Sequence, residues 1–362
     1  MKLMPHLLAG AFVLLGASLA SAADTQSILS RIKLPQGFRI AVYAEVPEAR
    51  SIANCGDNLI VSSRDGSIYA VRPDGSGGGK ATRIASDLHS PNGVACHGDR
   101  LYVGLQDKVS SWPIAADGSI QRNGRKDLLD LPDKAHHGWR YTGIGPDGKL
   151  YVAIGSPCNI CQPEGLEGSI IRMNTDGSDK ETVASGVRNS VGFDWQPSTG
   201  TMFFTDNGAD TMGDDTPPDE LNEVRKVGDF YGFPYFGGTV RLKGYADKKP
   251  PREQTPPAHA FKAHVAALGM HFYRGAMFPA AFRGDVFVAQ HGSWNRTEPD
   301  GANVVRVHFE NGQPKSEEIF AQGWLQGSRK LGRPVDVKEF RDGSLAVSDD
   351  EAGLIYRISY GG

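Results

Sequence analysis

A short unit that recurs along the chain constrains the fold more than any other feature of this sequence. Each copy begins with Asp-Gly or a related tight turn, continues into a strand of alternating apolar and polar residues, and in most copies leads to a second strand. The six copies lie at residues 57–71, 99–103, 147–173, 200–204, 284–307 and 342–358. Such turns favour β-hairpins, and the alternation is typical of half-buried strands. Each copy therefore predicts a small antiparallel sheet.

Six such sheets predict a ring. One small sheet cannot bury its apolar faces alone, whereas copies packed face to face in a circle bury them and leave only short edges. The spacing of about forty to sixty residues, with one longer interval, matches blade-sized units. We therefore expect an all-β chain, a six-bladed β-propeller of four-stranded antiparallel blades. A pair of β-sandwiches is the rival fold, and six near-equal units argue against it. The 45 Gly and 22 Pro residues fit many short strands joined by turns.

The N-terminus predicts export. Lys2 precedes an apolar run over residues 7–19 and small residues at 20–22, which is the pattern of a cleaved secretory signal peptide. We assign residues 1–22 to this signal, and residues 23–362 to a single propeller domain with a long loop insertion around residues 206–265. No later apolar stretch is long enough to span a bilayer, and no cysteine directly follows the signal. A periplasmic or secreted protein without a lipid anchor is expected.

The four cysteines predict two disulfides, because exported chains with an even number of cysteines usually pair them. Cys55 and Cys96 occupy matching places in successive copies, so a bond between two blades is expected. Cys158 and Cys161 form a close pair after a strand. A redox-active thiol would favour a helix N-terminus, and zinc would need a second pair of ligands. A local structural disulfide is therefore the favoured interpretation.

Candidate site residues lie in loops beside the repeats, since loops near the axis carry function in rings of blades. His136 and His137 are adjacent before the third copy, and an imidazole that titrates near neutrality can accept a hydroxyl proton. Arg188 and Asn189 can bind an oxygen-rich anion by forked hydrogen bonds. The acidic segment 205–222 is either a solvated loop or a Ca²⁺ site. Residues 290–296 are rich in polar and aromatic side chains, and residues 332–336, with Arg333, open the last copy.

Signatures of several other classes are missing from the sequence. The chain has no Gly-rich nucleotide fingerprint, P-loop, haem-attachment motif or zincin motif, so a nicotinamide dinucleotide is not the expected cofactor. The formal net charge of −3 provides no basic footprint for a nucleic-acid partner. It also provides no electrostatic reason to expect binding to a membrane surface.

These segments, in this order, resemble the glucose/sorbosone dehydrogenase family, whose members are soluble propeller enzymes that use pyrroloquinoline quinone and calcium. The likeness runs from residues 34–38 to the last copy, and it is closest to the sorbosone dehydrogenase branch through residues 137–140, 291–296 and 332–336. The resemblance implies a quinoprotein that oxidises an aldose sugar, sorbosone or a related alcohol or aldehyde by hydride transfer to the quinone. A separate electron acceptor would then reoxidise the cofactor.

The resemblance also implies roles for individual residues. The family's general base stands four positions before an Arg on the third blade, which corresponds to His136; a spacing of three positions would select His137. Arg188 would stabilise the negative charge that develops on oxygen. The quinone-binding residues would be Asn92, Arg188, Asn189 and Arg333. Calcium would rest on the backbone carbonyls of Gly208 and Ala209.

The chain departs from the family pattern at four places. Val191 stands where the glucose enzymes have Gln, Ala135 replaces the Asp before the base, no Lys lies near Gly292, and Val335 replaces a second Arg. A quinone with three carboxylates needs positive partners. Arg296 or His264 is therefore expected to compensate as a further cofactor-binding residue.

Two other function classes fit a six-bladed, metal-bearing propeller. One is calcium-dependent hydrolysis of a lactone or ester, which needs metal-bound water and no quinone. The other is a non-enzymatic binding module. The dehydrogenase, which the resemblance implies, is favoured over both.

Overall fold

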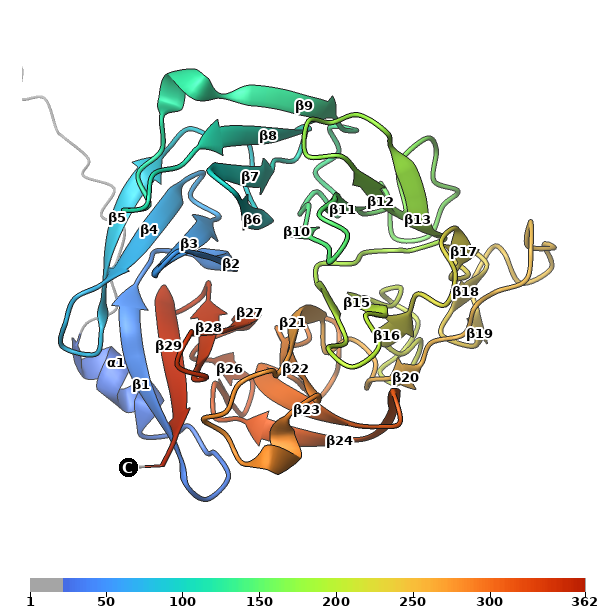
Figure 1. Cartoon of the computed structure of the whole chain (residues 1–362). Coiled ribbons are helices and arrows are strands. Elements are labelled where there is room, and N and C mark those ends of the chain that lie inside the picture. Colours follow the sequence, from blue (N-terminus) through green and yellow to red (C-terminus); the bar gives the residue numbers. More distant parts are fainter. Residues whose placement is uncertain (1–21, 362) are drawn as a thin grey trace, which may run out of the picture.

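Six small sheets stand as blades around a central axis in the computed structural model, which describes residues 22–361 (Figure 1). The predicted six-bladed β-propeller is confirmed. Five sheets have four antiparallel strands, and the sheet that contains β10 has a fifth strand, β17, which pairs in parallel with β13. This blade is wider than the repeat predicted, because its extra strand comes from the long interval between two later strands.

The blades follow one another in chain order, each beginning at the axis. The first two blades are β2 (Ala49–Cys55), β3 (Asn58–Ser63), β4 (Ile68–Pro73) and β5 (Gly79–Ala85), then β6 (Val94–His97), β7 (Arg100–Gly104), β8 (Lys108–Pro113) and β9 (Lys126–Asp130). The third and fourth are β10 (Thr142–Ile144), β11 (Leu150–Ile154), β12 (Ser169–Met173), β13 (Glu181–Ser185) and β17 (Asp229–Phe230), then β14 (Phe193–Trp195), β15 (Met202–Asp206), β16 (Glu220–Glu223) and β20 (His259–Ala260). The fifth is β21 (Ala267–Phe272), β22 (Val286–Gln290), β23 (Asn303–Glu310) and β24 (Gln313–Ala321).

The sixth blade closes the ring with a strand from the other end of the chain. It contains β27 (Pro334–Glu339), β28 (Leu345–Asp349) and β29 (Leu354–Tyr360), and its outer strand is β1 (Phe38–Glu45). Phe38 lies opposite Tyr360 in the ladder, and their rings meet at 4.8 Å. Pairing of the first strand with the last therefore joins the two ends of the propeller.

Smaller elements surround the blades. They are helix α1 (Ala22–Leu29), the hairpins β18 (Phe236–Gly237) with β19 (Val240–Arg241) and β25 (Leu325–Gln326) with β26 (Arg329–Lys330), and the 3-10 turns η1 (Arg122–Gly124) and η2 (Ala280–Phe282). The interval from 206 to 265 contains β16, β17, the β18–β19 hairpin and β20. No helix among residues 22–361 has the length and apolar character needed to cross a membrane. The predicted signal peptide lies outside the described residues, apart from its last position.

The hydrophobic core lies between blades. Tyr102 and Val109 of the second blade, for example, share one buried cluster with Val152 and Ile171 of the third. Equivalent clusters join the other neighbouring pairs. The alternating strands therefore bury both faces of each sheet against neighbours, as the propeller argument required.

Both predicted disulfides are confirmed. Cys55 ends the inner strand of the first blade and bonds to Cys96 in the inner strand of the second, across 41 residues of sequence. Cys158 bonds to Cys161 in the loop after β11, and no free cysteine remains among the described residues.

The ring has two chemically different ends. The connector end contains the segments that lead from one blade to the next inner strand, at 86–93, 131–141, 186–192, 261–266 and 322–333, together with the loops between second and third strands. The hairpin end contains the turns between first and second strands, at 56–57, 98–99, 145–149, 196–201, 273–285 and 340–344. Because neighbouring strands are antiparallel, each set of loops lies at one end of the ring.

Candidate active site

All of the predicted site residues lie at the connector end. The residues on blade-to-blade segments are Asn92, His136, His137, Arg188, Asn189, His264 and Arg333, and those on loops between second and third strands are Gly208, Ala209 and Arg296. Residues from five different blade junctions are thereby brought to one mouth. The strand order alone brings these segments to one end of the ring, and the hydrogen bonds described below connect them.

His137 is held in one orientation by a loop of the third blade. Its Nδ1 lies 2.9 Å from the carbonyl oxygen of Ser156 and 3.1 Å from the Ser156 hydroxyl, which itself donates to the Cys158 carbonyl at 2.8 Å. A carbonyl oxygen can only accept, so Nδ1 carries the proton and Nε2 keeps its lone pair. The backbone of His137 is in the left-handed region, with φ of 52°. Strained positions of this kind cluster at functional sites.

His136 is less constrained than its neighbour. It is exposed, and its ring centroid lies 4.1 Å from that of His137. Burial and the nearby Arg188 guanidinium lower the pKa of His136. The same two causes, with His136 added, lower the pKa of the more buried His137 well below its ordinary value. Both imidazoles are therefore neutral at pH 7, and His137 has the better-defined basic nitrogen.

Arg140 fixes the segment that carries the histidines. Its buried guanidinium donates from Nε to the Gln106 carbonyl at 3.1 Å, from Nη1 to the His137 carbonyl at 3.1 Å and from Nη2 to the Pro132 carbonyl at 2.6 Å. Three backbone carbonyls at a charged donor make a rigid support. Arg140 thus acts on the backbone of the histidine segment.

Arg188 is the centre of a buried network and is only 3% exposed. Its Nε and Nη2 donate to the backbone and side-chain oxygens of Asn159 at 2.9 and 2.8 Å, Nη1 donates to the Asn207 carbonyl at 3.1 Å, and Nη2 pairs with Asp210 at 2.8 Å. A guanidinium has five N–H donors, so one remains for another group. Arg188 can therefore donate only one further hydrogen bond, for example to a bound ligand.

Two buried carboxylates shape the backbone around the predicted calcium position. Asp206 accepts from the backbone N–H of Arg188 at 2.8 Å and of Asn189 at 2.5 Å, and burial raises its pKa to about 7. Asp219 accepts from the backbone N–H of Gly208 at 2.8 Å, and burial raises its pKa to about 6. Among the described residues, no donor is hydrogen-bonded to the carbonyl oxygens of Gly208 and Ala209. Those oxygens are therefore free to face a hard cation.

A second network, from the first and sixth blades, lies on the other side of the mouth. Arg50 donates to the Asn92 side chain at 3.2 Å and pairs with Asp350 at 3.0 Å, and His291 contacts the same carboxylate at 2.8 Å. Arg333 donates to the carbonyl of His291 at 3.1 Å. Burial opposes the charge of Asp350, but His291, Arg50 and Arg333 outweigh it and hold its pKa well below the usual range.

The two residues expected to compensate for missing cations are engaged with neighbouring loops. Arg296 donates to the carbonyl of Asp214 and, at 3.3 Å, to that of Ala263, while His264 Nε2 donates to the carbonyl of Gly213 at 2.8 Å. Sequence reasoning missed Arg50 and Lys330, which add positive charge at this end. Lys330 donates to the Ser293 carbonyl at 2.6 Å. Arg50 is the one charged residue of its inner strand, a signal that could have identified it.

Three amide side chains at this mouth have buried polar atoms without a partner among residues 22–361. They are Asn92 Nδ2, Asn189 Oδ1 and Asn295 Oδ1. A buried polar atom left unpaired costs on the order of 1–3 kcal/mol. Such atoms at one mouth are typical of a site that binds a polar ligand.

Comparison with known proteins gives both a family and a fold. Residues 126–357 match the Glucose / Sorbosone dehydrogenase family. An uncharacterized protein of Borreliella burgdorferi is 34% identical over 369 residues, which cover 96% of this chain and 95% of the relative.

Solved structures with the same fold are more distant in sequence. The PQQ domain of pyranose dehydrogenase from Coprinopsis cinerea, in its holo form, superposes with a TM-score of 0.75 at 19% identity, covering 91% of this chain and 97% of that one. The PQQ-bound aldose sugar dehydrogenase from Streptomyces coelicolor gives 0.65 at 18% identity, covering 90% and 99%. The family match extends over more than half of the chain, and the chain therefore belongs to the glucose/sorbosone dehydrogenase family.

Proposed function

We propose that this protein is a periplasmic quinoprotein that oxidises an aldose sugar, sorbosone or a related alcohol or aldehyde, with pyrroloquinoline quinone and Ca²⁺ at the connector end. The observation that carries the proposal is the geometry of His137. A neutral imidazole with its Nδ1 hydrogen committed to Ser156 presents a basic Nε2 beside Arg188. This is the arrangement that removal of a hydroxyl proton requires.

The residues at this mouth fit a flat anion with three carboxylates. Arg50, Arg333 and Lys330 supply positive charge on one side, and unpaired amide atoms of Asn92 and Asn189 supply hydrogen-bonding groups. Arginine suits carboxylates because its planar fork matches their geometry. We propose that Asn92, Asn189, Arg188, Arg333, His264 and Arg296 hold the quinone, and that Arg50 and Lys330 replace the cations missing from the family pattern.

The calcium proposal rests on backbone oxygens. Gly208 and Ala209 have carbonyls that take no hydrogen bond from the described residues, and calcium prefers carbonyl and carboxylate oxygens. Among those residues no group of three or more His, Cys, Asp or Glu side chains is arranged as a metal site. The ion would therefore be held mainly by main-chain carbonyl oxygens, those of Gly208 and Ala209.

When bound, the quinone would supply a hydride acceptor and the calcium ion would supply a Lewis acid beside it. His137 Nε2 takes the hydroxyl proton of the substrate, and Ser156 keeps the imidazole in the tautomer that can accept it. Arg188 offers its one remaining N–H to oxygen on which negative charge develops. His136 lies against the ring of His137 at the exposed side, where it is the alternative base.

Reconstitution tests the proposal and its two alternatives together. The purified protein is treated with a chelator, supplied with the quinone and CaCl₂, and assayed for reduction of a dye with glucose, sorbosone and other aldoses. The proposal predicts turnover that needs both additions. A hydrolase would instead open a lactone without the quinone, and a binding module would do neither.

A matched pair of arginines tests where the quinone binds. Arg333→Met should weaken quinone affinity by about 10- to 100-fold, the usual effect of removing a charged hydrogen-bond partner. Arg329→Met, which changes an exposed side chain of β26, is the control and should leave the affinity unchanged. Equal affinities for both variants and the wild type would move the cofactor away from this mouth.

Export is part of the proposal. Both disulfides would persist in an oxidising compartment, which supports release beyond the cytoplasm. N-terminal sequencing of the protein from a periplasmic fraction should find a start after residue 22. A chain that retains Met1 in the cytoplasmic fraction would contradict it.

A further inference from the structure

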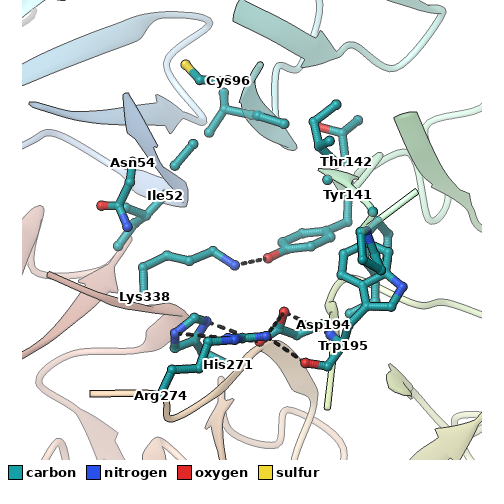
Figure 2. A pocket seen from close by; sticks show the side chains of 18 residues that line it. Ile52, Asn54, Cys96, Tyr141, Thr142, Asp194, Trp195, His271, Arg274 and Lys338 are labelled. Atoms are coloured by element: carbon teal, nitrogen blue, oxygen red, sulfur yellow. Dashed lines mark hydrogen bonds and ion pairs between the residues drawn. The ribbon is translucent and has the colours of Figure 1, made fainter. Parts of the chain in front are cut away.

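A cavity at the hairpin end is separate from the site described above. It has a volume of about 360 Å³ and is lined by inner-strand and hairpin residues of all six blades (Figure 2). Lys338 and Tyr141 reach toward each other across it, and Asp194, His271 and Arg274 form a connected group along one side (Figure 2). This volume lies within the range of about 300–1,000 Å³ that is usual for small-molecule sites.

An apolar layer divides this cavity from the connector end. Val191, Leu268 and Val335 are buried together and packed against Trp139. On the same three chain segments the cavity residues Asp194, His271 and Lys338 come three positions later. Three residues of extended chain advance at most about 10 Å, so the cavity residues lie further toward the hairpin end than this apolar layer.

Lys338 is the cation that this cavity leaves without an acidic partner. Its Nζ donates to the Tyr141 hydroxyl at 3.0 Å, and that hydroxyl donates to Asp336 at 3.4 Å. Within the described part of the chain no carboxylate forms an ion pair with Nζ, so two of its three N–H donors remain. Burial opposes the charge, but Tyr141 and Asp336 outweigh it and raise the pKa of Lys338. The ammonium is therefore charged at neutral pH.

The other charged groups around the cavity are already matched. Arg274 donates from Nη1 and Nη2 to the two carboxylate oxygens of Asp194, at 2.9 Å each. His271 Nδ1 lies 3.2 Å from the same carboxylate. Glu339 accepts the backbone N–H groups of Arg274 and Gly275 at 2.8 and 3.0 Å. Only the Lys338 ammonium is available for an incoming anion.

The remaining wall is aromatic. Tyr141 meets Phe193 at 5.0 Å with an interplanar angle of 84°, and Phe193 meets Trp195 at 5.6 Å and 78°. Tyr141 and Phe193 are buried, whereas Trp195 keeps part of its surface open at the cavity. Aromatic side chains prefer ring partners in stacked or edge-to-face contact. A ring seated here would contact these residues while one end of it meets Lys338.

We propose that the hairpin-end cavity binds a small aromatic monocarboxylate, with its carboxylate on Lys338 and its ring against Trp195, Phe193 and Tyr141. The site has one ammonium with two N–H donors that no carboxylate occupies, which suits a ligand with a single carboxylate. It does not depend on the quinone or on the dehydrogenase proposed above, because none of the residues that line the cavity belongs to the proposed quinone site.

Calorimetric titration of the full protein with benzoate, in the absence of quinone, tests this site. The wild type should bind benzoate more tightly than benzyl alcohol, which has the ring without the charge. Lys338→Met should weaken benzoate binding by about 10- to 100-fold and abolish the preference over the alcohol. Lys330→Met removes an ammonium at the connector end and should leave benzoate affinity unchanged.

Two results would overturn the proposal: no binding of benzoate by the wild type at up to ~10 mM, or equal affinity in Lys338→Met. If Lys338→Met does not fold, as judged by circular dichroism, Trp195→Leu provides the same test and should weaken benzoate binding several-fold. Dye reduction by the quinone-loaded protein is measured separately, so failure of one proposal leaves the other standing.

Discussion

Replacing His137 by Asn should lower kcat by about 10²- to 10⁴-fold while quinone binding is retained, because general-base catalysis contributes a factor of that size. At 1.36 kcal/mol for each tenfold change, this is about 3–5 kcal/mol of activation free energy. Asn is the appropriate replacement, since the φ of 52° at this position is tolerated better by Asn than by Ala. Loss of the Nδ1 hydrogen bond to Ser156 should cost about 1 kcal/mol of stability, which leaves the protein folded.

The neighbouring histidine provides the matched control. His136→Asn changes an exposed side chain whose ring packs against His137, so kcat should fall by less than about tenfold. Steady-state dye reduction of the two loaded variants, with quinone affinity measured by titration, separates chemistry from binding. Equal losses in the two variants, or a larger loss in His136→Asn, would refute the tautomer argument and return the role of base to His136.

The pH dependence has a definite sign. Burial and Arg188 lower the pKa of His137, so the base stays unprotonated to lower pH than an ordinary imidazole, and the acid limb of kcat/KM should lie below pH ~6.5. In the unfolded chain the same imidazole takes up a proton near pH ~6.5. The stability contributed by neutral His137 is therefore complete above that pH and is lost as the pH falls. An acid limb above pH 6.5 would contradict this assignment.

Other parts of the molecule give sharp comparisons. Cys55→Ser opens a disulfide that closes a loop of 41 residues and should lower the free energy of unfolding by about 4 kcal/mol. Cys158→Ser opens a disulfide that closes a loop of 3 residues and should lower it by about 1.5 kcal/mol. Urea unfolding measures both losses, and a larger loss for Cys158→Ser would show that loop entropy does not set them. Arg50→Met leaves the buried Asp350 carboxylate poorly compensated and should destabilise the protein by about 3–5 kcal/mol, whereas Arg64→Met, whose side chain is 42% exposed, should cost less than ~1 kcal/mol. Chelation of calcium should lower quinone affinity and added CaCl₂ should restore it, whereas unchanged affinity in chelator would exclude a role for Gly208 and Ala209.

Much of the site's location followed from local sequence. Once the repeats predict antiparallel blades, the segments before each inner strand must meet at one end, so His137, Arg188 and Arg333 converge without any knowledge of their contacts. The pairing of Cys55 with Cys96 followed in the same way from their matching places. Arg50 was missed because its partner Asp350 is 300 residues away, and no local pattern links the two.

The sequence by itself determined the kind of structure, because turn residues and apolar alternation act on dihedral angles and burial within a few residues. The sequence did not determine how the ring closes, because closure depends on β1 pairing with β29, which lies at the other end of the chain. Nor did spacing distinguish His136 from His137; our proposal of His137 as the base rests on a contact from another loop, the Ser156 carbonyl at its Nδ1. The cavity at the hairpin end likewise exists only in the assembled ring, since its charge and its aromatic wall come from strands that meet through long-range packing.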